Sequence, residues 1–496
     1  MAETGGPAHF LAFDLGAESG RAVLGRLDGG RLTVHEVRRF PNTPFALSGH
    51  IHWNVHALFE EMKTAMREAA AALGARPASL GVDTWGVDFG LLDRDGLMLG
   101  LPFCYRDGRN AGAMEDYLRL VPREALYEAT GIQLMPFNTL FQVYAMVRDR
   151  SPLLDAAADL LFMPDLFNYL LAGRKAAELT IASTSQMLDP RTRTWIPGLF
   201  QAMGLSKSLL QPLVRPGTVL GPVADGVAAQ TGFRDVPVVA VAGHDTASAV
   251  AAVPAEGAGW AYISSGTWSL VGVEEPAPVV SPRSLEANFT NEGGVGGTVR
   301  LLKNVTGLWL VQGCRKAWGG EAAGAYEDLA REAEGAPAFS ALIDPDHPDF
   351  LNPPDMPEAV AARCRATGQA PPGTRAALVR SLLESLALKY RYVLDQLRLV
   401  AGRPIDRIHV IGGGSRNALL CRFTAEATGL PVVAGPAEAT AVGNILVQAM
   451  ALGRVASPAE MRAIVRASFE LRTYEPGRAR RDWDAAYARF REVLGA

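Results

Sequence analysis

The sequence predicts an α/β protein built from two related halves. Segments with the pattern of strands alternate with segments of helical pattern, which is typical of helices layered on a sheet. Segment 264–270 (Ser-Ser-Gly-Thr-Trp-Ser-Leu) resembles segment 18–24 (Glu-Ser-Gly-Arg-Ala-Val-Leu), and each predicts a strand, a tight Ser/Gly turn and a second strand. At 496 residues the chain is too long for one hydrophobic core. We therefore expect two or three domains, with a duplicated domain and a cleft between the halves.

The first half should begin with three strands followed by a helix. Residues 10–14, 21–27 and 32–40 are apolar or alternate in polarity, and Asp28-Gly29-Gly30 supplies the turn between the last two. Asn54 is a suitable N-cap for a helix over 55–73. Further along, we expect short strands at 80–83 and 89–92, a turn at 93–96, mainly helical structure over 107–172, and a buried β-branched strand at 236–242.

The pattern restarts in the second half, after Gly257. A strand at 260–263 precedes the second Ser/Gly turn, and a long amphipathic helix covers 374–400. We then expect a strand at 407–411, the turn Gly412-Gly413-Gly414, a helix over 417–428, a strand at 431–434, a helix over 439–452 and a terminal helix beyond residue 472. The Pro-rich stretch 344–357 and the Gly/Pro stretch 368–373 predict surface loops.

Composition and charge describe an ordinary globular protein. The chain is 48% hydrophobic and 20% charged, and its formal charge of −4 gives no electrostatic reason for a nucleic-acid or anionic-membrane partner. The four cysteines are far apart and form no Cys-x-x-Cys, which favours a reducing compartment. Residues 1–7 show neither the basic nor the apolar region of a signal peptide. The apolar segment 236–253 has His244 and Asp245 in its middle, which argues against a membrane helix. We expect a cytoplasmic protein.

Each Ser/Gly turn has the composition of an anion-binding loop, because glycine lets backbone N–H groups approach an anion. Two such turns facing each other would hold a polyphosphate, which is the first indication of a nucleotide enzyme. Asp14 ends the first strand, directly before the turn, and its carboxylate is suited to hold Mg²⁺ or a water of Mg²⁺. The alternative is an ordinary Asp that opens a β-hairpin. The sequence contains neither G-x-x-x-x-G-K-[ST] nor G-x-G-x-x-G.

The segment His244-Asp245-Thr246 lies between two apolar runs, directly after Gly243. Burial at this position would raise the pKa of Asp245 or demand partners for its carboxylate. Such a carboxylate is placed to accept a proton from a sugar hydroxyl as a general base. On spacing alone, however, the favoured interpretation is that Asp245 caps the following helix through the amides of residues 246–249.

Two further segments allow either a binding or a structural interpretation. In segment 83–88 (Asp-Thr-Trp-Gly-Val-Asp), Trp85 could stack on a sugar face and Gly86 could let the backbone meet a hydroxyl. The alternative is a strand end with an ordinary core Trp. The turn 412–415 suits a nucleotide base that lies flat against the backbone, although a run of glycines can also form only a tight turn.

Taken together, these motifs resemble those of the FGGY carbohydrate kinases, and most closely the rhamnulokinase branch of that family. The matching segments occur in the family's order, so the set is specific although each single motif is weak. They are 13–21, 82–89, 101–102 with 105–107, 136–140, 243–250, 264–270, 291–294, 302–304, 307–309 and 412–414. One departure is Glu18 in the first phosphate loop, where the family often has a small residue. An acidic side chain near a triphosphate is repulsive unless it points away or helps to hold the metal.

The resemblance implies an actin-like or hexokinase-type fold, in which two domains of ribonuclease H-like topology (1–253 and 254–496) flank an active-site cleft. It implies ATP as co-substrate together with Mg²⁺, which Asp14 would hold directly or through water. Asp245 would be the catalytic base that deprotonates the sugar's 1-hydroxyl, so the resemblance favours this role over the helix cap. The other implied site residues are Gly86, His244, Asp245, Thr246 and Asn304 at the sugar, and Ala17, Glu18, Ser19, Gly20, Arg21, Thr267, Gln312 and Gly413 at the nucleotide.

The function that we expect is ATP-dependent phosphorylation of L-rhamnulose to L-rhamnulose 1-phosphate, in rhamnose catabolism. One alternative is a kinase for another ketose or deoxyketose such as L-fuculose, because sugar choice depends on loop residues such as Trp85, Phe137 and Asn138. Another is a non-catalytic sugar or nucleotide sensor on the same fold, although the presence of both Asp14 and Asp245 argues against it. An assembly ATPase would leave the sugar-side residues unexplained. The expected partners are the sugar and Mg-ATP, without nucleic acid or membrane, and the chain should be a monomer or homodimer.

Overall fold

The computed structural model describes residues 6–205, 209–477 and 480–495. Residues 1–5, in the segment on which the signal-peptide prediction rests, lie outside the described residues. The chain divides into two compact units. Unit 1 is formed by the described residues of Met1–Ala252, Glu274–Leu301 and Ala439–Ser468, and unit 2 by those of Val253–Val273, Leu302–Glu438 and Phe469–Ala496. The expected domain boundary between residues 253 and 254 stays a prediction.

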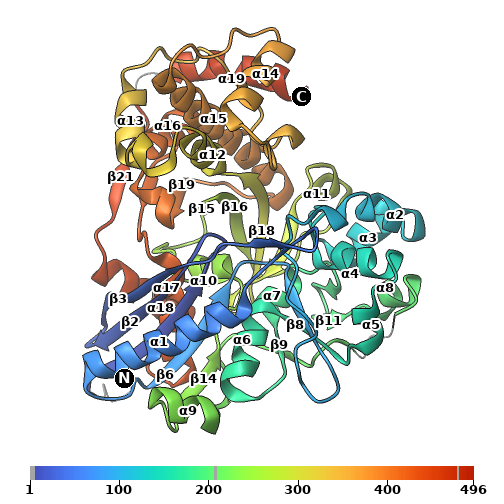
Figure 1. Cartoon of the computed structure of the whole chain (residues 1–496). Coiled ribbons are helices and arrows are strands. Elements are labelled where there is room, and N and C mark those ends of the chain that lie inside the picture. The colour runs from blue at the N-terminus through green and yellow to red at the C-terminus, as the bar shows by residue number, and fades with distance from the viewer. Residues whose placement is uncertain (1–5, 206–208, 478–479, 496) are drawn as a thin grey trace. The chain divides into compact units, whose positions relative to one another are not determined.

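The sheet of unit 1 has six strands in the order β13-β14-β6-β1-β2-β3 (Figure 1). Short turns join β1, β2 and β3 into an antiparallel meander, whereas β1, β6 and β14 run parallel. The bounds are β1 (Ala8–Leu15), β2 (Ser19–Asp28), β3 (Arg31–Pro41), β6 (Ser79–Thr84), β13 (Thr218–Pro222) and β14 (Pro237–Ala240). The strands that the sequence predicts for this sheet are therefore present, and β13 is an addition.

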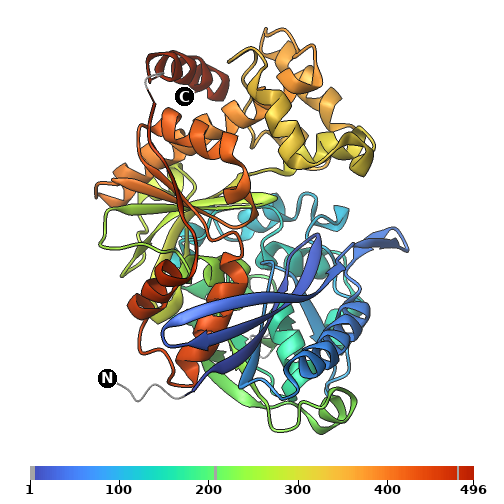
Figure 2. The ribbon, with the colours of Figure 1, turned by 90° about the vertical axis from the view of Figure 1, so that its left-hand side faces the viewer.

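Helices pack against both faces of this sheet, because successive residues of a strand point to opposite faces. Val82 of β6 lies in one core cluster with Leu58 of helix α1, whereas Asp83 accepts a hydrogen bond from Asn444 of helix α17. In Figure 2, α1 and the strands β1 to β3 are blue and α17 is orange-red. The helices on or beside the sheet are α1 (Val55–Leu73), α6 (Met163–Ala172), α9 (Asp225–Thr231), α10 (Asp245–Ala251), α17 (Ala439–Ala451) and α18 (Pro458–Ser468).

A second group of elements in unit 1 lies between β6 and β13 along the chain. Strand β7 (Phe89–Leu92) pairs antiparallel with β8 (Asp159–Phe162), and the buried residues of this group form their own core cluster. The prediction of mainly helical structure over 107–172 is confirmed, but it missed β8. The helices are α2 (Ala113–Leu120), α3 (Arg123–Thr130), α4 (Thr139–Arg148), α5 (Pro152–Ala156), α7 (Leu179–Ser183) and α8 (Pro197–Ala202). Small strand pairs are β4 (Phe45–Leu47) with β5 (His50–His52), β10 (Leu188–Asp189) with β11 (Thr194–Trp195), and β9 (Ala177–Glu178) with β12 (Leu213–Val214).

The second sheet has seven strands in the order β17-β18-β16-β15-β19-β20-β21. Strand β15 pairs antiparallel with β16 and parallel with β19, which in turn pairs parallel with β20. The order β18-β16-β15-β19-β20 repeats the order β3-β2-β1-β6-β14 of the first sheet. This repetition confirms two related α/β halves of ribonuclease H-like topology. The bounds are β15 (Trp260–Ser265), β16 (Trp268–Glu275), β17 (Thr290–Gly293), β18 (Val299–Thr306), β19 (Arg407–Ile411), β20 (Val432–Ala434) and β21 (Arg472–Tyr474).

The helices of unit 2 agree with the sequence predictions with one correction. The expected long helix is α15 (Arg375–Ala401), the next is α16 (Ala418–Thr428), and the terminal helix is α19 (Arg480–Leu494). The loop expected over 344–357 is wrong at its end, because α14 (Met356–Ala366) begins there. Asp355 Oδ1 caps α14 by accepting the amide of Glu358 at 2.9 Å, and proline is tolerated in a first turn. The remaining α-helices are α11 (Pro282–Glu286) in unit 1 and α12 (Trp309–Ala317) and α13 (Tyr326–Glu334) in unit 2.

Two further observations concern the cysteines and the question of a membrane-spanning helix. All four cysteines are buried and none forms a disulfide. Within the described ranges, no helix combines the length and the apolar character that a membrane crossing requires.

Candidate active site

The candidate site of unit 1 lies at the carboxyl ends of three parallel strands. Asp14 and Asp83 are register partners at the ends of β1 and β6. Shortly after β14, the carbonyl of Gly243 accepts the amide of Thr84 at 2.9 Å, which holds the start of α10 beside the end of β6. Three carboxylates that are far apart in the sequence therefore gather at one edge of the sheet, namely Asp14, Asp83 and Asp245.

Asp245 is the first residue of α10, and His244 rather than Asp245 occupies the N-cap position. The Oδ1 atom of Asp245 accepts the amide of Thr246 at 2.5 Å and its hydroxyl at 3.1 Å. Burial raises the pKa of Asp245; His244 opposes this shift, and repulsion by Asp14 adds to it. The side chain nevertheless stays 31% exposed. The carboxylate is therefore a stronger base than an ordinary aspartate and remains open to a ligand.

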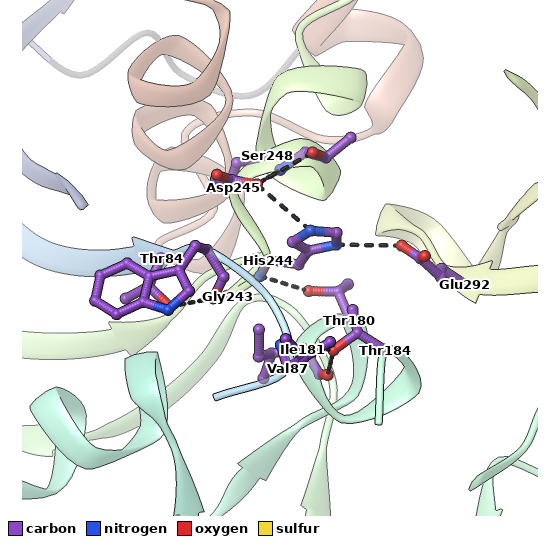
Figure 3. A network of polar contacts seen from close by, with 12 residues as sticks. Thr84, Val87, Thr180, Ile181, Thr184, Gly243, His244, Asp245, Ser248 and Glu292 are labelled. Carbon is purple, nitrogen blue, oxygen red and sulfur yellow. Dashed lines mark hydrogen bonds and ion pairs between the residues drawn. The ribbon is translucent and has the colours of Figure 1, made fainter. Parts of the chain in front are cut away.

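The His244 ring lies between Asp245 and Glu292 of β17 (Figure 3). Its Nε2 is 3.4 Å from Asp245 Oδ1, and its Nδ1 is 3.2 Å from Glu292 Oε2. The ring is buried, and a methyl group added to Gly86 would lie 3.4 Å from Nε2. Four of the five residues expected at the sugar thus lie together in unit 1: Gly86, His244, Asp245 and Thr246.

A buried carboxylate, Glu178, fixes the backbone that precedes His244. Its Oε2 accepts the amide of Gly243 at 2.9 Å and the hydroxyl of Thr180 at 2.5 Å. The same hydroxyl accepts the amide of His244 at 3.2 Å, as Figure 3 shows. Burial raises the pKa of Glu178 to about 7, although these donors favour its ionised form. Glu178 and Thr180 together hold the segment to which the candidate base belongs.

The first predicted phosphate loop is the turn between β1 and β2. The amide of Gly16 donates to the carbonyl of Ser19 at 3.0 Å, which closes the turn. Asn42, directly after β3, braces it from the side: its amide donates to the Glu18 carbonyl at 3.0 Å and its Nδ2 to the Gly16 carbonyl at 2.7 Å. Glu18 is exposed, so water screens its charge. The turn therefore has a fixed backbone with its acidic residue in solvent.

Asp14 and Asp83 provide oxygen atoms whose chemistry fits Mg²⁺. Arg21 donates Nε and Nη2 to Asp14 Oδ2 at 2.9 and 2.6 Å, and Asn444 donates to Asp83 Oδ2 at 2.6 Å. Asp83 Oδ1 is buried without a hydrogen-bond partner, and burial together with repulsion by Asp14 raises the pKa of Asp83 well above its usual range. A hard divalent cation binds such carboxylate oxygens and reduces the repulsion between their negative charges. Among the described residues, no group of three or more His, Cys, Asp or Glu side chains could hold a metal ion by itself.

The structure assigns Trp85 to the core of unit 1. The side chain is buried, its ring centroid lies 4.2 Å from that of Trp53, and its Nε1 donates to Asp88 Oδ2 at 3.0 Å. Trp53 Nε1 donates to the same oxygen at 2.6 Å. Of the two interpretations that the sequence allowed, the core Trp is therefore correct, and the indole is not free to stack on a sugar.

Unit 2 contains the other residues expected at the ligands. Thr267 lies in the β15–β16 turn, where its carbonyl accepts the amides of Gly307 at 3.1 Å and Trp309 at 3.2 Å, and Asn304 lies on β18. A cavity of about 500 Å³ in this unit is lined by Gln312 and Gly413 and by Gly266, directly before Thr267. Gln312 Oε1 is buried without a hydrogen-bond partner. The apolar part of the lining is made by Leu308, Val311, Val379, Leu383 and Leu419. Charged side chains, among them Arg331 and Glu334, complete the lining. A partly open cavity with an apolar part and one amide oxygen without a hydrogen-bond partner suits a flat heteroaromatic ring with polar groups.

The three consecutive glycines at the edge of this cavity have different surroundings. A Cβ on Gly414 would lie 2.0 Å from Ser265 Oγ, and one on Gly412 would lie 3.1 Å from the Ser265 carbonyl. A Cβ on Gly413 would meet nothing within 4 Å. Packing against β15 therefore requires the outer glycines, whereas Gly413 has open space where a side chain would lie.

Residues that hold the backbone of the site were not predicted from the sequence. Glu178, Thr180 and Asn42 hold backbone, and none lies in a motif that signals this role. Glu292 belongs to a segment noted for its resemblance (291–294), but nothing in the sequence indicates that it reaches His244. Only the fold reveals such partners, because they are distant in sequence from the groups that they hold.

Two family models match the chain. The N-terminal domain of the FGGY family of carbohydrate kinases matches residues 9–252, and its C-terminal domain matches residues 261–452. A rhamnulokinase of Bacteroides thetaiotaomicron is 47% identical over 98% of this chain and 99% of its own length. A rhamnulokinase of Pectobacterium carotovorum is 43% identical over 98% of this chain and 96% of its own length.

Solved structures of sugar kinases share the fold. A ligand-bound xylulose kinase from Lactobacillus acidophilus superposes with a TM-score of 0.80 at 15% identity, and a glycerol kinase from Plasmodium falciparum with ADP at 0.78 and 14% identity. Each comparison covers 99% of both chains. At such low identity these structures support the fold alone.

Proposed function

The chain belongs to the FGGY family of carbohydrate kinases, and from this premise we propose that it phosphorylates L-rhamnulose at the 1-hydroxyl, with ATP as phosphoryl donor. The products are L-rhamnulose 1-phosphate and ADP, in rhamnose catabolism. The observation that carries the choice of sugar is the near full-length similarity to relatives named rhamnulokinase, at 38 to 47% identity. The proposed setting is the cytoplasm, which the unbonded cysteines support.

Asp245 is the catalytic base in this proposal. Its carboxylate takes the proton of the sugar's 1-hydroxyl, and the oxygen attacks the γ-phosphorus of ATP. The bond from that phosphorus to the β,γ-bridging oxygen breaks, and ADP leaves. The raised pKa and partial exposure of Asp245 support this role, because a base must both reach the hydroxyl and hold the proton. Gly86, His244, Thr246 and Asn304 bind the sugar.

Two groups of residues bind the nucleotide in this proposal. The turn residues Ala17, Glu18, Ser19, Gly20 and Arg21 bind phosphates together with Thr267, and Gln312 and Gly413 contact the base side of the nucleotide. The cavity that Gln312 and Gly413 line supports the second part of this assignment. Residues 1–253 would then bind the sugar and the first phosphates, and residues 254–496 the nucleotide.

Asp14 is the residue that we propose to hold Mg²⁺. Its Oδ2 is engaged by Arg21, so a water between Asp14 and the cation is the arrangement that its contacts favour. Mg²⁺, when bound, neutralises charge on the phosphoryl oxygens, in a reaction where catalysis is mainly positioning and charge stabilisation.

The test measures ADP release from Mg-ATP with L-rhamnulose, L-fuculose, D-xylulose, L-ribulose and glycerol. We expect the highest kcat/KM with L-rhamnulose, and a loss of about 10²- to 10⁴-fold in kcat for Asp245→Asn, because the base is removed. The matched control is Asp225→Asn, since Asp225 is also the first residue of its helix, α9, but is exposed. It should leave the rate unchanged.

Other outcomes of this assay would contradict specific parts of the proposal. Preference for L-fuculose or another sugar would keep the kinase mechanism and overturn the substrate. Full activity in Asp245→Asn would remove Asp245 as the base. No turnover on any sugar, with ATP still bound, would favour a sensor over an enzyme.

A further inference from the structure

We propose that Arg300 and Glu292 are positioning residues that keep His244 in one tautomer, with its ring hydrogen on Nε2, facing Asp245. This proposal rests on the proposed function, which identifies Asp245 as the base, and adds how Asp245 is oriented. All four residues belong to unit 1.

Arg300 forms a hydrogen bond with His244 that determines the tautomer of the ring. Arg300, on β18, is fully buried, and its Nη2 lies 3.1 Å from His244 Nδ1 in hydrogen-bonding geometry. A guanidinium has only donors, and it does not lose its proton in proteins. His244 Nδ1 must therefore be the acceptor, so the hydrogen of the neutral imidazole is on Nε2.

Glu292 forms an ion pair with Arg300 and holds it in place. Glu292 Oε2 is 3.0 Å from Arg300 Nη2, and both side chains are buried. Burial opposes ionisation of Glu292, but the charge of Arg300, together with the contacts to His244 and Thr290, outweighs it, so the pKa of Glu292 lies below its ordinary value. The backbone fixes the pair as well, because Arg300 Nε donates to the Gly293 carbonyl at 2.9 Å. Ser183 Oγ of α7 accepts the amide of Gly293 at 2.8 Å.

The surroundings of His244 disfavour the other tautomer, which has its hydrogen on Nδ1. Glu292 Oε2 is also 3.2 Å from His244 Nδ1, so a hydrogen on Nδ1 would have an acceptor there. That hydrogen would, however, face the donors of Arg300 at 3.1 Å. It would also leave the bare lone pair of Nε2 3.4 Å from the carboxylate of Asp245. Both contacts would be repulsive. The tautomer with hydrogen on Nε2 has one such contact instead, between the Nδ1 lone pair and Glu292 Oε2, and the positive Arg300 Nη2 lies close to both of these atoms, at 3.1 and 3.0 Å.

The tautomer matters because it determines which oxygen of the base is free. With hydrogen on Nε2, His244 is a donor beside Asp245 Oδ1, which already accepts the amide and the hydroxyl of Thr246. Thr246 therefore donates two hydrogen bonds to Oδ1 and the hydrogen on Nε2 faces the same oxygen, so Oδ2 is left to take the proton of the sugar. For histidines that bind a metal, loss of the group that fixes the tautomer typically lowers affinity or activity by about 10- to 100-fold, and we expect an effect of the same order here.

The experiment compares Arg300→Met, which cannot donate, with Arg300→Lys, which can. We expect Arg300→Met to lower kcat by about 10- to 100-fold, with a much smaller change in KM for ATP. Arg300→Lys should recover a larger part of kcat, and Glu292→Gln should fall between them. The matched control is Arg193→Met, because Arg193 Nη2 donates to the Gly297 carbonyl in the segment between β17 and β18 without contacting His244. It should retain full activity.

A spectroscopic readout separates the tautomer from a loss of folding. In protein labelled with ¹⁵N-histidine, the ring signals of His244 are assigned by their loss in His244→Asn, among eight histidines in all. Wild type should show a protonated Nε2 and an unprotonated Nδ1, and Arg300→Met should show a mixture. A hydrogen on Nδ1 in the wild type would overturn the inference, as would an unchanged kcat in a folded Arg300→Met. Because this spectrum needs neither sugar nor ATP, it decides the inference even if the proposed substrate proves wrong.

Discussion

At the scale of single residues, two glycines that the resemblance assigns to ligands have unlike surroundings. A Cβ on Gly20 would lie 2.3 Å from the ring of Phe40, so packing between β2 and β3 is sufficient to require glycine there. A Cβ on Gly86 would have ordinary contacts, at 3.4 Å from His244 Nε2 and 3.6 Å from Thr184 Oγ1. The fold thus tolerates a methyl group at Gly86, and only a ligand would exclude it.

This difference gives a prediction for Gly86→Ala. We expect the free energy of unfolding to change by less than about 0.5 kcal/mol, because the methyl group meets no close neighbour. The KM for the sugar should rise by about 10-fold or more, since one methyl group in a binding pocket is worth roughly 1–3 kcal/mol. Steady-state kinetics and chemical denaturation measure the two effects. Gly108→Ala, in an exposed position with open space around it, is the control. An unchanged sugar KM would remove Gly86 from the sugar site.

At the scale of elements, helix α17 determines where the helix of the candidate base can lie. Gly443 of α17 crosses α10 so closely that a Cβ would lie 1.8 Å from the carbonyl oxygen of Ser248. The neighbouring Asn444 donates to Asp83 at 2.6 Å, and Gln448 donates to the Leu11 carbonyl at 3.0 Å. The position of α10, and with it that of Asp245, therefore depends on a backbone contact that allows no side chain.

We predict that Gly443→Ala destabilises unit 1 by about 1–3 kcal/mol or more, because the clash is with backbone and cannot be relieved by a rotamer change. Sugar phosphorylation should fall further than stability alone explains, since α10 must move. The matched control is Gly226→Ala in α9, a helical glycine with open space around it, which should gain up to about 1 kcal/mol. Thermal unfolding with kinetics on the folded fraction checks both. Equal stability of the two variants would show that the crossing is more tolerant than its geometry indicates.

The turn between β19 and α16 gives a second prediction at this scale. Gly413→Ala should leave stability nearly unchanged and raise the KM for ATP, because the methyl group enters the cavity of unit 2 rather than the protein interior. Gly414→Ala should instead destabilise the fold, since its Cβ would lie 2.0 Å from Ser265 Oγ. ATP titration by calorimetry and thermal unfolding separate the two effects. Unchanged ATP affinity in Gly413→Ala would contradict the proposed nucleotide contact.

At the scale of the whole molecule, buried carboxyl groups make stability depend on pH. Burial raises the pKa of Glu178 from its ordinary 4.5 to about 7 and that of Asp88 from 3.8 to about 6. Between the ordinary and the raised pKa, the folded state keeps a proton that the unfolded state has released. The contribution of each group to the free energy of unfolding therefore falls as pH rises through that window, by at most about 1.4 kcal/mol per pH unit.

The test compares wild type with Glu178→Gln by denaturant unfolding at pH 5, 6, 7 and 8. We expect the variant to be less stable, with a deficit that is largest at pH 5, shrinks up to pH 7 and is constant above it. The deficit shrinks because the wild type loses free energy of unfolding as Glu178 releases its proton, whereas the variant has no proton to release at this position. Asp88→Asn should alter the slope mainly below pH 6. A deficit independent of pH would mean that Glu178 titrates alike in both states.

The sequence predicts most of the framework of this molecule and less of its site. Helix α1 is found because an N-cap and apolar periodicity coincide at Asn54, and the strands are found because apolar runs end in turn residues. Asp245 stands out because a charged residue interrupts an apolar run. Glu178 gives no such signal, since the Gly243 amide that it binds is 65 residues away. Trp85 stays ambiguous in sequence, because an indole serves a core and a sugar face equally well.

The return of α17 to the first sheet has a consequence for how the protein is made. Asn444 is 361 residues from the Asp83 carboxylate that it binds. At an elongation rate of about 5–20 residues per second, that interval lasts roughly 20 to 70 s. Throughout it, the ribosome holds a chain whose first sheet lacks α17 and whose Asp83 carboxyl group lacks its amide partner. A chaperone that binds exposed strands would find its substrate in this nascent form, and a fragment ending before residue 439 would remain in that state permanently.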